Sequence, residues 1–232
     1  CRRAELSWSL GRRAFLGSAG AIAASTLIPR PLAAAPAELA PVKLPPPITR
    51  EERLARIAKA QGLMQRNGIG SVVVESGPSL DYFTGTQWWR SERLTGVVIP
   101  VAGDPIIVTP FFEKPSIEEM LLVPAEIRTW EEDEEPLKLV ADFLKERGVA
   151  GQPVAFEETN RFFIEDRLKQ QLPSVAVVNG NPVVRQLRMI KSPAELALMQ
   201  AAADIMAASL RYAGERTRDG MSPEQIDGLI AS

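Results

Sequence analysis

Residues 49–75 read TREERLARIAKAQGLMQRNGIGSVVVE, a helix pattern followed at once by a strand pattern. Thr49 and Glu52 have the spacing of a capping box, in which the threonine oxygen accepts a backbone N–H and the glutamate returns to the cap. Gly68 is placed to end the helix in the left-handed conformation. The apolar face between these ends comprises Leu54, Ile57, Ala58 and Met64. Ser71–Glu75, with three consecutive valines, has the β-branched composition of a buried strand.

The same alternation continues downstream of this first pair. Further strands are predicted at Gly96–Pro100, Pro105–Thr109, Glu126–Trp130, Pro153–Phe156 and Ser174–Val178, and helices near Ser116–Leu122, Glu134–Arg147 and Phe162–Gln171. Alternation of this kind is typical of α/β folds. Only four residues, 101–104, separate the second strand from the third. A link of that length makes a hairpin, so this pair is antiparallel and we expect an α/β domain with a mixed sheet.

After Asn181-Pro182 the pattern changes to helix alone. Ser192-Pro193-Ala194-Glu195 forms a second capping box with proline at the first helical position. The helix that follows carries one apolar stripe, made of Leu196, Met199, Ala203, Met206 and Leu210. Ser222–Gln225 opens a third helix that reaches Ser232, about two turns on. A stripe of this kind needs a partner surface, so we expect a carboxyl-terminal portion to follow.

The first 37 residues have the pattern of a twin-arginine export signal. Arg12 and Arg13 stand directly before Phe15-Leu16 and an alanine-rich run, Ser18–Ile28. That run holds 11 residues, whereas crossing a bilayer takes about 20, so we expect no permanent membrane anchor. Small residues follow, with a cleavage site predicted after Ala37. Residues 38–48 are proline-rich and form a predicted linker.

Composition excludes several classes of chemistry. The chain has 232 residues, a formal net charge of −2, no histidine and one cysteine, Cys1. Residues 1–37 hold five arginines against Glu5, which leaves 22 basic and 28 acidic residues downstream. A protein this acidic is a poor candidate for nucleic-acid binding. Without histidine there is no Ser/His/Asp triad and the commonest zinc ligand is missing, so we assign no catalytic residue and no metal ligand.

Two unusual segments have alternative interpretations. The acidic run Glu131–Glu135 could hold a metal, but it is interpreted as a solvated loop whose carboxylates complement the start of the helix at Glu134. The segment Trp88-Trp89-Arg90-Ser91-Glu92-Arg93 concentrates two of the four tryptophans beside two arginines. It forms either a packed corner with an Arg–Glu pair or a binding surface, since tryptophan and arginine are favoured at interfaces and ligand sites.

Three segments carry a family resemblance. Asp81-Tyr82-Phe83-Thr84-Gly85 resembles a "-YLTG-" turn, Leu187–Leu196 resembles an "LR-IKSP-EI" junction, and Asp219–Glu224 resembles a "-GMTE-" step. In this order and spacing they resemble the creatinase/prolidase/aminopeptidase P family. The resemblance spans Thr49 to the end of the chain. It implies a creatinase-like amino-terminal α/β domain at residues 49–181, and a linker with the first helices of a truncated "pita-bread" catalytic domain at residues 182–232.

The resemblance also implies a function. Most peptidase members hold two divalent cations, which here would be manganese, cobalt or zinc, on two aspartates, a histidine and two glutamates that lie beyond Ser232. Creatinase has the same fold without the metals. The implied parent protein is an Xaa-Pro peptidase acting on short proline-containing peptides, exported to the periplasm or secreted, and assembled as a homodimer or homotetramer. This chain alone is expected to be inactive.

In related enzymes the segment after the "-YLTG-" turn contributes substrate-contacting side chains across the subunit interface. Trp88, Trp89, Arg90 and Arg93 are therefore the predicted substrate-binding residues, as the resemblance implies. Two alternatives stay open. One is a creatinase-like C–N hydrolase acting on a small guanidino or amide compound. The other is a stand-alone, non-catalytic binding or dimerisation module.

Overall fold

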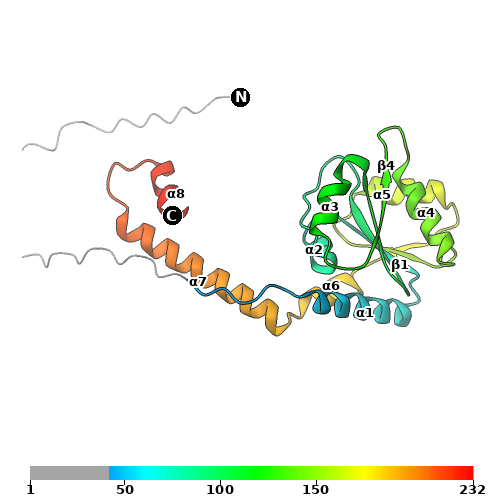
Figure 1. Cartoon of the computed structure of the whole chain (residues 1–232), viewed down its shortest axis with the longest axis horizontal. Coiled ribbons are helices and arrows are strands. Elements are labelled where there is room, and N and C mark those ends of the chain that lie inside the picture. The colour runs from blue at the N-terminus through cyan, green and yellow to red at the C-terminus, as the bar shows by residue number, and fades with distance from the viewer. Residues whose placement is uncertain (1–41, 232) are drawn as a thin grey trace, which may run out of the picture.

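The computed structural model describes residues 42–231 of the chain. The predicted signal peptide with Arg12 and Arg13, its cleavage site and the first part of the linker lie outside the described residues. Within them, an α/β domain is followed by a long helical arm that extends away from it (Figure 1).

The centre of the domain is a six-stranded mixed sheet. Its strands are β1 (Ser71–Glu75), β2 (Gly96–Pro100), β3 (Ile106–Pro110), β4 (Glu126–Trp130), β5 (Val154–Phe156) and β6 (Val177–Asn179), in the order β4-β3-β2-β1-β5-β6. The predicted hairpin is confirmed, because β2 and β3 pair antiparallel with Val97 opposite Ile107. β1 pairs antiparallel with β2 and parallel with β5. The predicted α/β class and the mixed sheet are therefore confirmed.

Helices cover both faces of the sheet. They are α1 (Arg50–Asn67), α2 (Pro78–Thr84), α3 (Lys114–Met120), α4 (Pro136–Glu146), α5 (Phe162–Gln171) and α6 (Val184–Met189), with a 3₁₀ turn at Phe111–Glu113 before α3. α4 and α5 pack on one face in a cluster that includes Val73, and α1, α2, α3 and α6 pack on the other in a cluster that includes Val72 and Val74. β1 is thus apolar on both sides, which explains its unbroken valine run.

The first helix begins and ends as predicted except for one side chain, but its predicted apolar face is wrong in part, because Ile57 and Met64 are buried while Leu54 and Ala58 are exposed. The Thr49 hydroxyl accepts the Glu52 backbone N–H at 3.2 Å. Gly68 ends the helix in the left-handed region with φ of 65°. The predicted return of the Glu52 carboxylate to the cap is wrong, because that carboxylate instead accepts hydrogen bonds from Arg56 and Ser192 at 2.8 Å each. Two competing donors, one of them charged, outweigh the local cap.

Two short helices have no counterpart among the predicted elements. Residues 81–85, which read as a turn, belong mostly to α2, and the chain leaves this helix at Gly85 with φ of 86°. α6 follows β6 and buries Val184 against α1. The predicted helix at Phe162–Gln171 coincides with α5, and the other predicted elements of the domain differ from the observed ones by three residues or fewer at each end.

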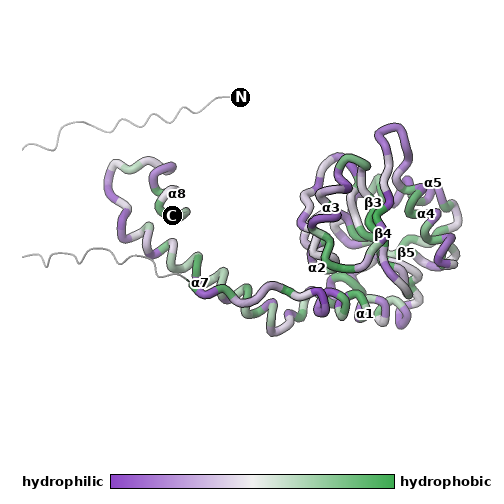
Figure 2. The backbone as a smooth tube through the Cα atoms, in the orientation of Figure 1, coloured by the Kyte–Doolittle hydropathy of each residue, from purple (hydrophilic) through white to green (hydrophobic). Residues whose placement is uncertain are grey.

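The arm consists of α7 (Pro193–Arg216) and α8 (Pro223–Ala231), and α8 contacts α7. The Ser192 capping box is confirmed, since its hydroxyl accepts the Glu195 N–H and the Glu195 carboxylate accepts the Ser192 N–H. Hydrophobic residues concentrate on the strands of the domain and recur along α7 (Figure 2). The α7 stripe is more than half exposed, with Leu196 56% and Leu210 52% accessible. Among the described residues, no helix is both long and apolar enough to span a membrane.

Candidate functional site

The sheet brings the ends of most strands to one edge. β1, β3, β4, β5 and β6 run in one direction and only β2 runs in the other. The carboxyl ends of five strands therefore share an edge with the start of β2, where the loop of residues 85–95 arrives. In open α/β sheets ligands bind outside the carboxyl ends of strands. This edge carries the predicted segment Trp88–Arg93, which we call the tryptophan loop.

A buried carboxylate stands at the centre of this edge. Glu75 is the last residue of β1, and its side chain is completely inaccessible. Its Oε1 accepts a 2.6 Å hydrogen bond from Arg161 Nε, and its Oε2 accepts the Arg161 backbone N–H at 3.2 Å. Arg90 Nε lies 3.5 Å from the same Oε2. Burying an unpaired carboxylate costs several kcal/mol, and here two guanidinium groups offset that cost.

Arg161 also holds the backbone of the tryptophan loop. Its Nη1 donates a 2.6 Å hydrogen bond to the Ser91 carbonyl, and its Nη2 donates a 3.1 Å hydrogen bond to the Arg93 carbonyl. The guanidinium lies over the Phe163 ring, 4.7 Å from its centroid. One planar guanidinium thus connects the carboxylate at the end of β1 to two carbonyls of the loop, a geometry that the five donors of arginine allow.

Both ends of the loop are fixed as well. Before it, the Thr86 N–H donates to the Thr84 hydroxyl at 3.1 Å. After it, the Trp130 indole N–H donates to the Leu94 carbonyl at 3.1 Å, and the Ser76 hydroxyl donates to the Thr95 carbonyl at 2.7 Å. Since these contacts engage backbone N–H and carbonyl groups on both sides of the loop, they fix the path of the chain there.

The two tryptophans differ in their surroundings. Trp88 is partly buried and packs against the apolar cluster that lies beneath α1 and α2. Trp89 is 88% exposed, the highest exposure among the large hydrophobic side chains of residues 42–231. An exposed indole costs hydrophobic free energy unless a partner or ligand covers it. Trp88 is therefore an anchor of the loop and Trp89 is its accessible aromatic group.

The two arginines differ in charge balance. Arg93 donates to Glu92 and to Glu132, so one guanidinium faces two carboxylates. Its hydrogen bond to Glu132 is the main reason that the pKa of Arg93 is raised. Arg90 has the opposite balance, because it shares the single carboxylate of Glu75 with Arg161. Arg90 thus keeps positive charge available for an anion, and its side chain is 38% exposed.

A second buried carboxylate, to which no sequence motif points, follows β5. Glu157 accepts a hydrogen bond from the Ser79 hydroxyl, and Arg188 Nη1 lies 3.5 Å from its Oε1. Arg188 also donates to Ser79 at 2.7 Å. These three residues join β5 to α2 and α6. The sequence signal for Glu157 is weak: it is a charged residue directly after a buried strand, much as Glu75 ends β1.

The acidic run has structural roles. Glu135 caps α4 by accepting the Leu137 N–H at 3.1 Å, Glu134 accepts the Glu131 N–H at 2.9 Å, and Glu132 pairs with Arg93. Within residues 42–231, no three carboxylate, thiol or imidazole side chains gather as they would to hold a metal ion. The residues described do not fit the dinuclear metal site that the resemblance implies.

Comparisons with known proteins agree with this architecture. Probable dipeptidase PepE of Mycobacterium tuberculosis is 30% identical over 154 residues, which are 65% of this chain and 40% of PepE. The crystal structure of dipeptidase PepE from Mycobacterium ulcerans matches with a TM-score of 0.64 at 29% identity, covering 79% of this chain and 49% of that one. A prolidase from Thermococcus sibiricus shares the fold with a TM-score of 0.67 at 24% identity, over 77% and 48%.

The chain therefore spans less than half the length of these curated relatives and structures. The model of the creatinase/prolidase N-terminal domain matches residues 56–190. This match takes in the sheet, the tryptophan loop and both buried carboxylates, and it covers more than half of the chain. The chain belongs to the creatinase/prolidase N-terminal domain family.

Proposed function

We propose that this chain is the amino-terminal part of an exported Xaa-Pro-type metallopeptidase, and that its tryptophan loop contacts substrate in the active site of a neighbouring subunit. Family membership and the similarity to dipeptidases support a peptidase. The observation that carries the role of the loop is the pairing of an 88% exposed indole at Trp89 with the charge-bearing Arg90 on a backbone fixed by Arg161.

The two exposed groups suit a short proline-containing peptide. An indole face packs against an apolar prolyl ring, and a guanidinium holds a peptide carboxylate through paired charge-assisted hydrogen bonds. Arg90 suits this task because its charge is not cancelled by Glu75. Arg93 is already engaged by two carboxylates, so in this proposal it supports the loop and Arg90 binds the substrate.

The hydrolytic step itself needs groups that residues 42–231 do not provide. By family resemblance, two divalent cations such as manganese, cobalt or zinc would supply an activated hydroxide from a site beyond Ser232. The part described here would orient the peptide and exclude water from it. Because the loop is proposed to act on a neighbouring subunit, the active protein is a homodimer or a larger homo-oligomer.

The protein is proposed to leave the cytoplasm by the twin-arginine route. Arg12 and Arg13, before a short apolar run, favour the twin-arginine route to the periplasm or the medium. That route carries folded proteins, which suits an enzyme that takes up its metal ions before export.

The test uses the enzyme produced from the complete gene. Xaa-Pro dipeptides should be hydrolysed, Xaa-Ala dipeptides much more slowly, and activity should disappear with a chelator and return with manganese, cobalt or zinc. Trp89→Ala and Arg90→Ala should each lower kcat/KM by about tenfold or more while circular dichroism and metal content stay unchanged. If the enzyme, with or without added metal, cleaves guanidino or amide compounds and no Xaa-Pro peptide, the C–N hydrolase is correct. A complete gene without catalytic ligands would identify a binding module.

A further inference from the structure

We propose that Arg161 and Glu75 form a clamp that positions the tryptophan loop, and that they are positioning residues for substrate binding although neither touches substrate. The inference rests on the proposed function of the loop. Neither residue belongs to the segment Trp88–Arg93, and Arg161 lies 68 residues or more from the carbonyls it holds.

The clamp starts from the carboxyl end of a central strand of the sheet. β1 is paired on both sides, with β2 and with β5, and Glu75 is its last residue. Asn160 braces the same end, because its Nδ2 donates to the Val73 carbonyl at 3.1 Å and its Oδ1 accepts the Glu75 N–H at 3.4 Å. A shift of Glu75 would therefore disturb its pairing with Gly96 and its contact with Asn160, so its backbone gives its carboxylate a defined position.

Arg161 is held in place from two directions. It is the N-cap residue of α5, and its own side chain does not cap that helix. The Glu75 carboxylate instead accepts the Arg161 N–H at 3.2 Å, so a negative group lies at the positive end of the α5 dipole. The Phe163 ring packs against one face of the Arg161 guanidinium. The backbone N–H of Arg161, the Glu75 carboxylate and the Phe163 ring thus fix the orientation of the guanidinium.

The Nη1 and Nη2 atoms of the Arg161 guanidinium contact the loop backbone. Ser91 and Arg93 offer their carbonyls to Nη1 and Nη2, at 2.6 and 3.1 Å. These are backbone acceptors on either side of Glu92, so the clamp fixes the loop whatever side chains it carries. A lysine at position 161 would keep the charge, but its single nitrogen could not reach the carboxylate and both carbonyls in the same plane.

Glu75 links the clamp to the proposed substrate group. Its Oε2 lies 3.5 Å from Arg90 Nε, and Arg90 Nη2 reaches the Thr159 hydroxyl at 3.4 Å. Glu75 ends β1, whereas Thr159 lies in the turn that follows β5. The Arg90 side chain is therefore held through both Nε and Nη2. Since Glu75 has one negative charge for two guanidinium groups, net positive charge remains at the exposed Arg90. Removing the clamp should weaken substrate binding more than it slows the chemical step.

The variants are Arg161→Lys and Glu75→Gln, and the control is Arg167→Lys. Arg167 lies on the same helix and over the same Phe163 ring at 5.4 Å, but its Nη1 reaches only the Glu135 carboxylate, at 3.7 Å, and contacts no carbonyl of the loop. All variants are first checked for native circular dichroism and thermal unfolding. Two clamp variants are used so that a folding failure of one leaves the other as the test.

The first measurement is hydrogen–deuterium exchange of residues 88–94 by mass spectrometry, which requires no activity. In the clamp variants, the exchange rate of this peptide should rise on the order of tenfold, while the exchange rate of the peptide that contains β1 should not change. Arg167→Lys should behave as wild type. If a folded clamp variant leaves exchange of the loop unchanged, the clamp is overturned.

The second measurement is steady-state kinetics on an Xaa-Pro dipeptide with the complete enzyme. The clamp variants should raise KM by about tenfold and change kcat less, because binding geometry is lost and the chemical groups are intact. A loosened loop with wild-type kinetics would overturn the substrate role and with it the positioning role. A fall in kcat alone, with KM unchanged, would also contradict positioning for binding. Faster exchange of the loop together with a higher KM supports both the clamp and its role in substrate binding.

Discussion

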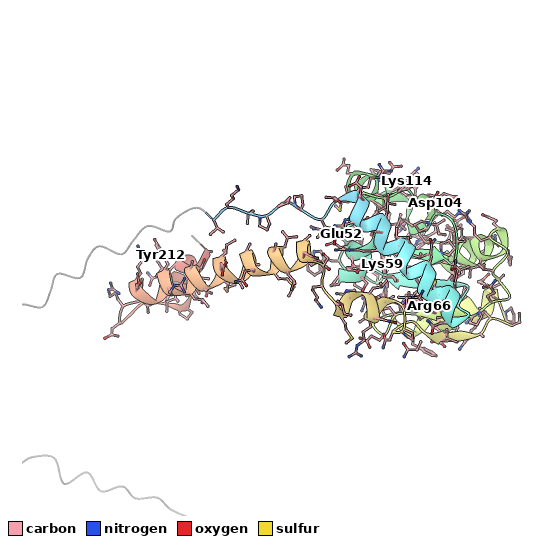
Figure 3. The ribbon with its side chains drawn as sticks, turned by 90° about the horizontal axis from the view of Figure 1, so that it is seen from below. Glu52, Lys59, Arg66, Asp104, Lys114 and Tyr212 are labelled. Carbon is pink, nitrogen blue, oxygen red and sulfur yellow. The ribbon has the colours of Figure 1, made fainter. Side chains whose placement is uncertain are left out.

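The Ser192 hydroxyl donates a 2.8 Å hydrogen bond to the Glu52 carboxylate, which ties the cap of α7 to the first turn of α1 across 140 residues. Arg56 binds the same carboxylate at 2.8 Å and lies 3.4 Å from Glu195 on α7. Figure 3 shows Glu52 at the end of α1 from which α7 departs. Because the apolar stripe of α7 is exposed, polar contacts at this junction set the direction of the arm.

The first prediction is that acid releases the arm. Burial raises the pKa of Glu52, but hydrogen bonds from Ser192 and Arg56 outweigh it and leave the pKa below the usual 4.5. A carboxylate with a lowered pKa stabilises the folded junction above pH 4.5, and the contribution is lost as the pH falls through the lower folded value. Protonation removes the acceptor charge that both donors share, so the junction should open below that pH.

Spin labels can measure this release because the only natural cysteine is Cys1. With Cys1 replaced by serine, labels at Lys59 on α1 and Ala202 on α7 should give a narrow distance distribution near neutral pH and a broad one in acid. Glu52→Gln should be broad at both values, and the surface variant Glu118→Gln should follow wild type. A narrow distribution for Glu52→Gln at neutral pH would contradict the role of the junction.

The second prediction separates the two tryptophans. Trp88 packs on the apolar cluster, so Trp88→Ala should lower the free energy of unfolding by about 1–3 kcal/mol. Trp89→Ala removes an exposed ring and should leave stability within about 0.5 kcal/mol of wild type. Urea unfolding of the two variants measures the difference. Equal destabilisation would mean that Trp89 also has an intramolecular partner.

Much of the fold could be predicted from the sequence because its signals are local. Gly68 at the end of α1, the Ser192 capping box and the short link between β2 and β3 each act within a few residues. α2 and α6 were not predicted, because residues 81–85 of the α2 region read as a turn and the six residues of α6 are too few to show helical periodicity.

The candidate site could be predicted only in part. The composition of Trp88–Arg93 pointed to the loop, but not to which members are free. That distinction depends on contacts between distant segments, such as the pairing of Glu75 with Arg161, 86 residues apart. The carboxylate of Glu52 shows the same limit, since a donor 140 residues away displaced the local cap that its spacing predicted.

The third prediction separates the two arginines by their kinetic effects. Arg90→Ala should raise KM for Xaa-Pro dipeptides about tenfold or more, because the guanidinium that is free for an anion is lost. Arg93→Ala should change KM much less, because its two carboxylate partners lie on the surface and the loop backbone stays held by Arg161. Steady-state kinetics of both variants of the complete enzyme measure the difference in KM. A larger effect at Arg93 would reverse the assignment.

The fourth prediction concerns the arm. A protein ending at Ser232 exposes Leu196, Met199, Met206 and Leu210, each more than half accessible. Leaving such side chains in water costs about 25 cal/mol per Å² and favours association. Analytical ultracentrifugation should therefore detect oligomers, and replacing the four residues with glutamine should yield monomers. A monomer with full amide protection along α7 would show that the stripe is stable in water.

The last prediction is that export depends on the arginine pair at residues 12 and 13. Arg12→Lys with Arg13→Lys keeps both positive charges and the apolar run Ser18–Ile28, so any effect isolates recognition of the guanidinium pair from general electrostatics. In a bacterial host with a twin-arginine system, the doubly substituted complete protein should stay in the cytoplasm as precursor, while the parent protein reaches the periplasm in its shorter, processed form. Arg2→Lys with Arg3→Lys is the matched control, because that pair precedes a mixed stretch, Ala4–Leu10, with no continuous apolar run. Fractionation and immunoblotting measure both, and equal periplasmic yield from the two double variants would rule out this route of export.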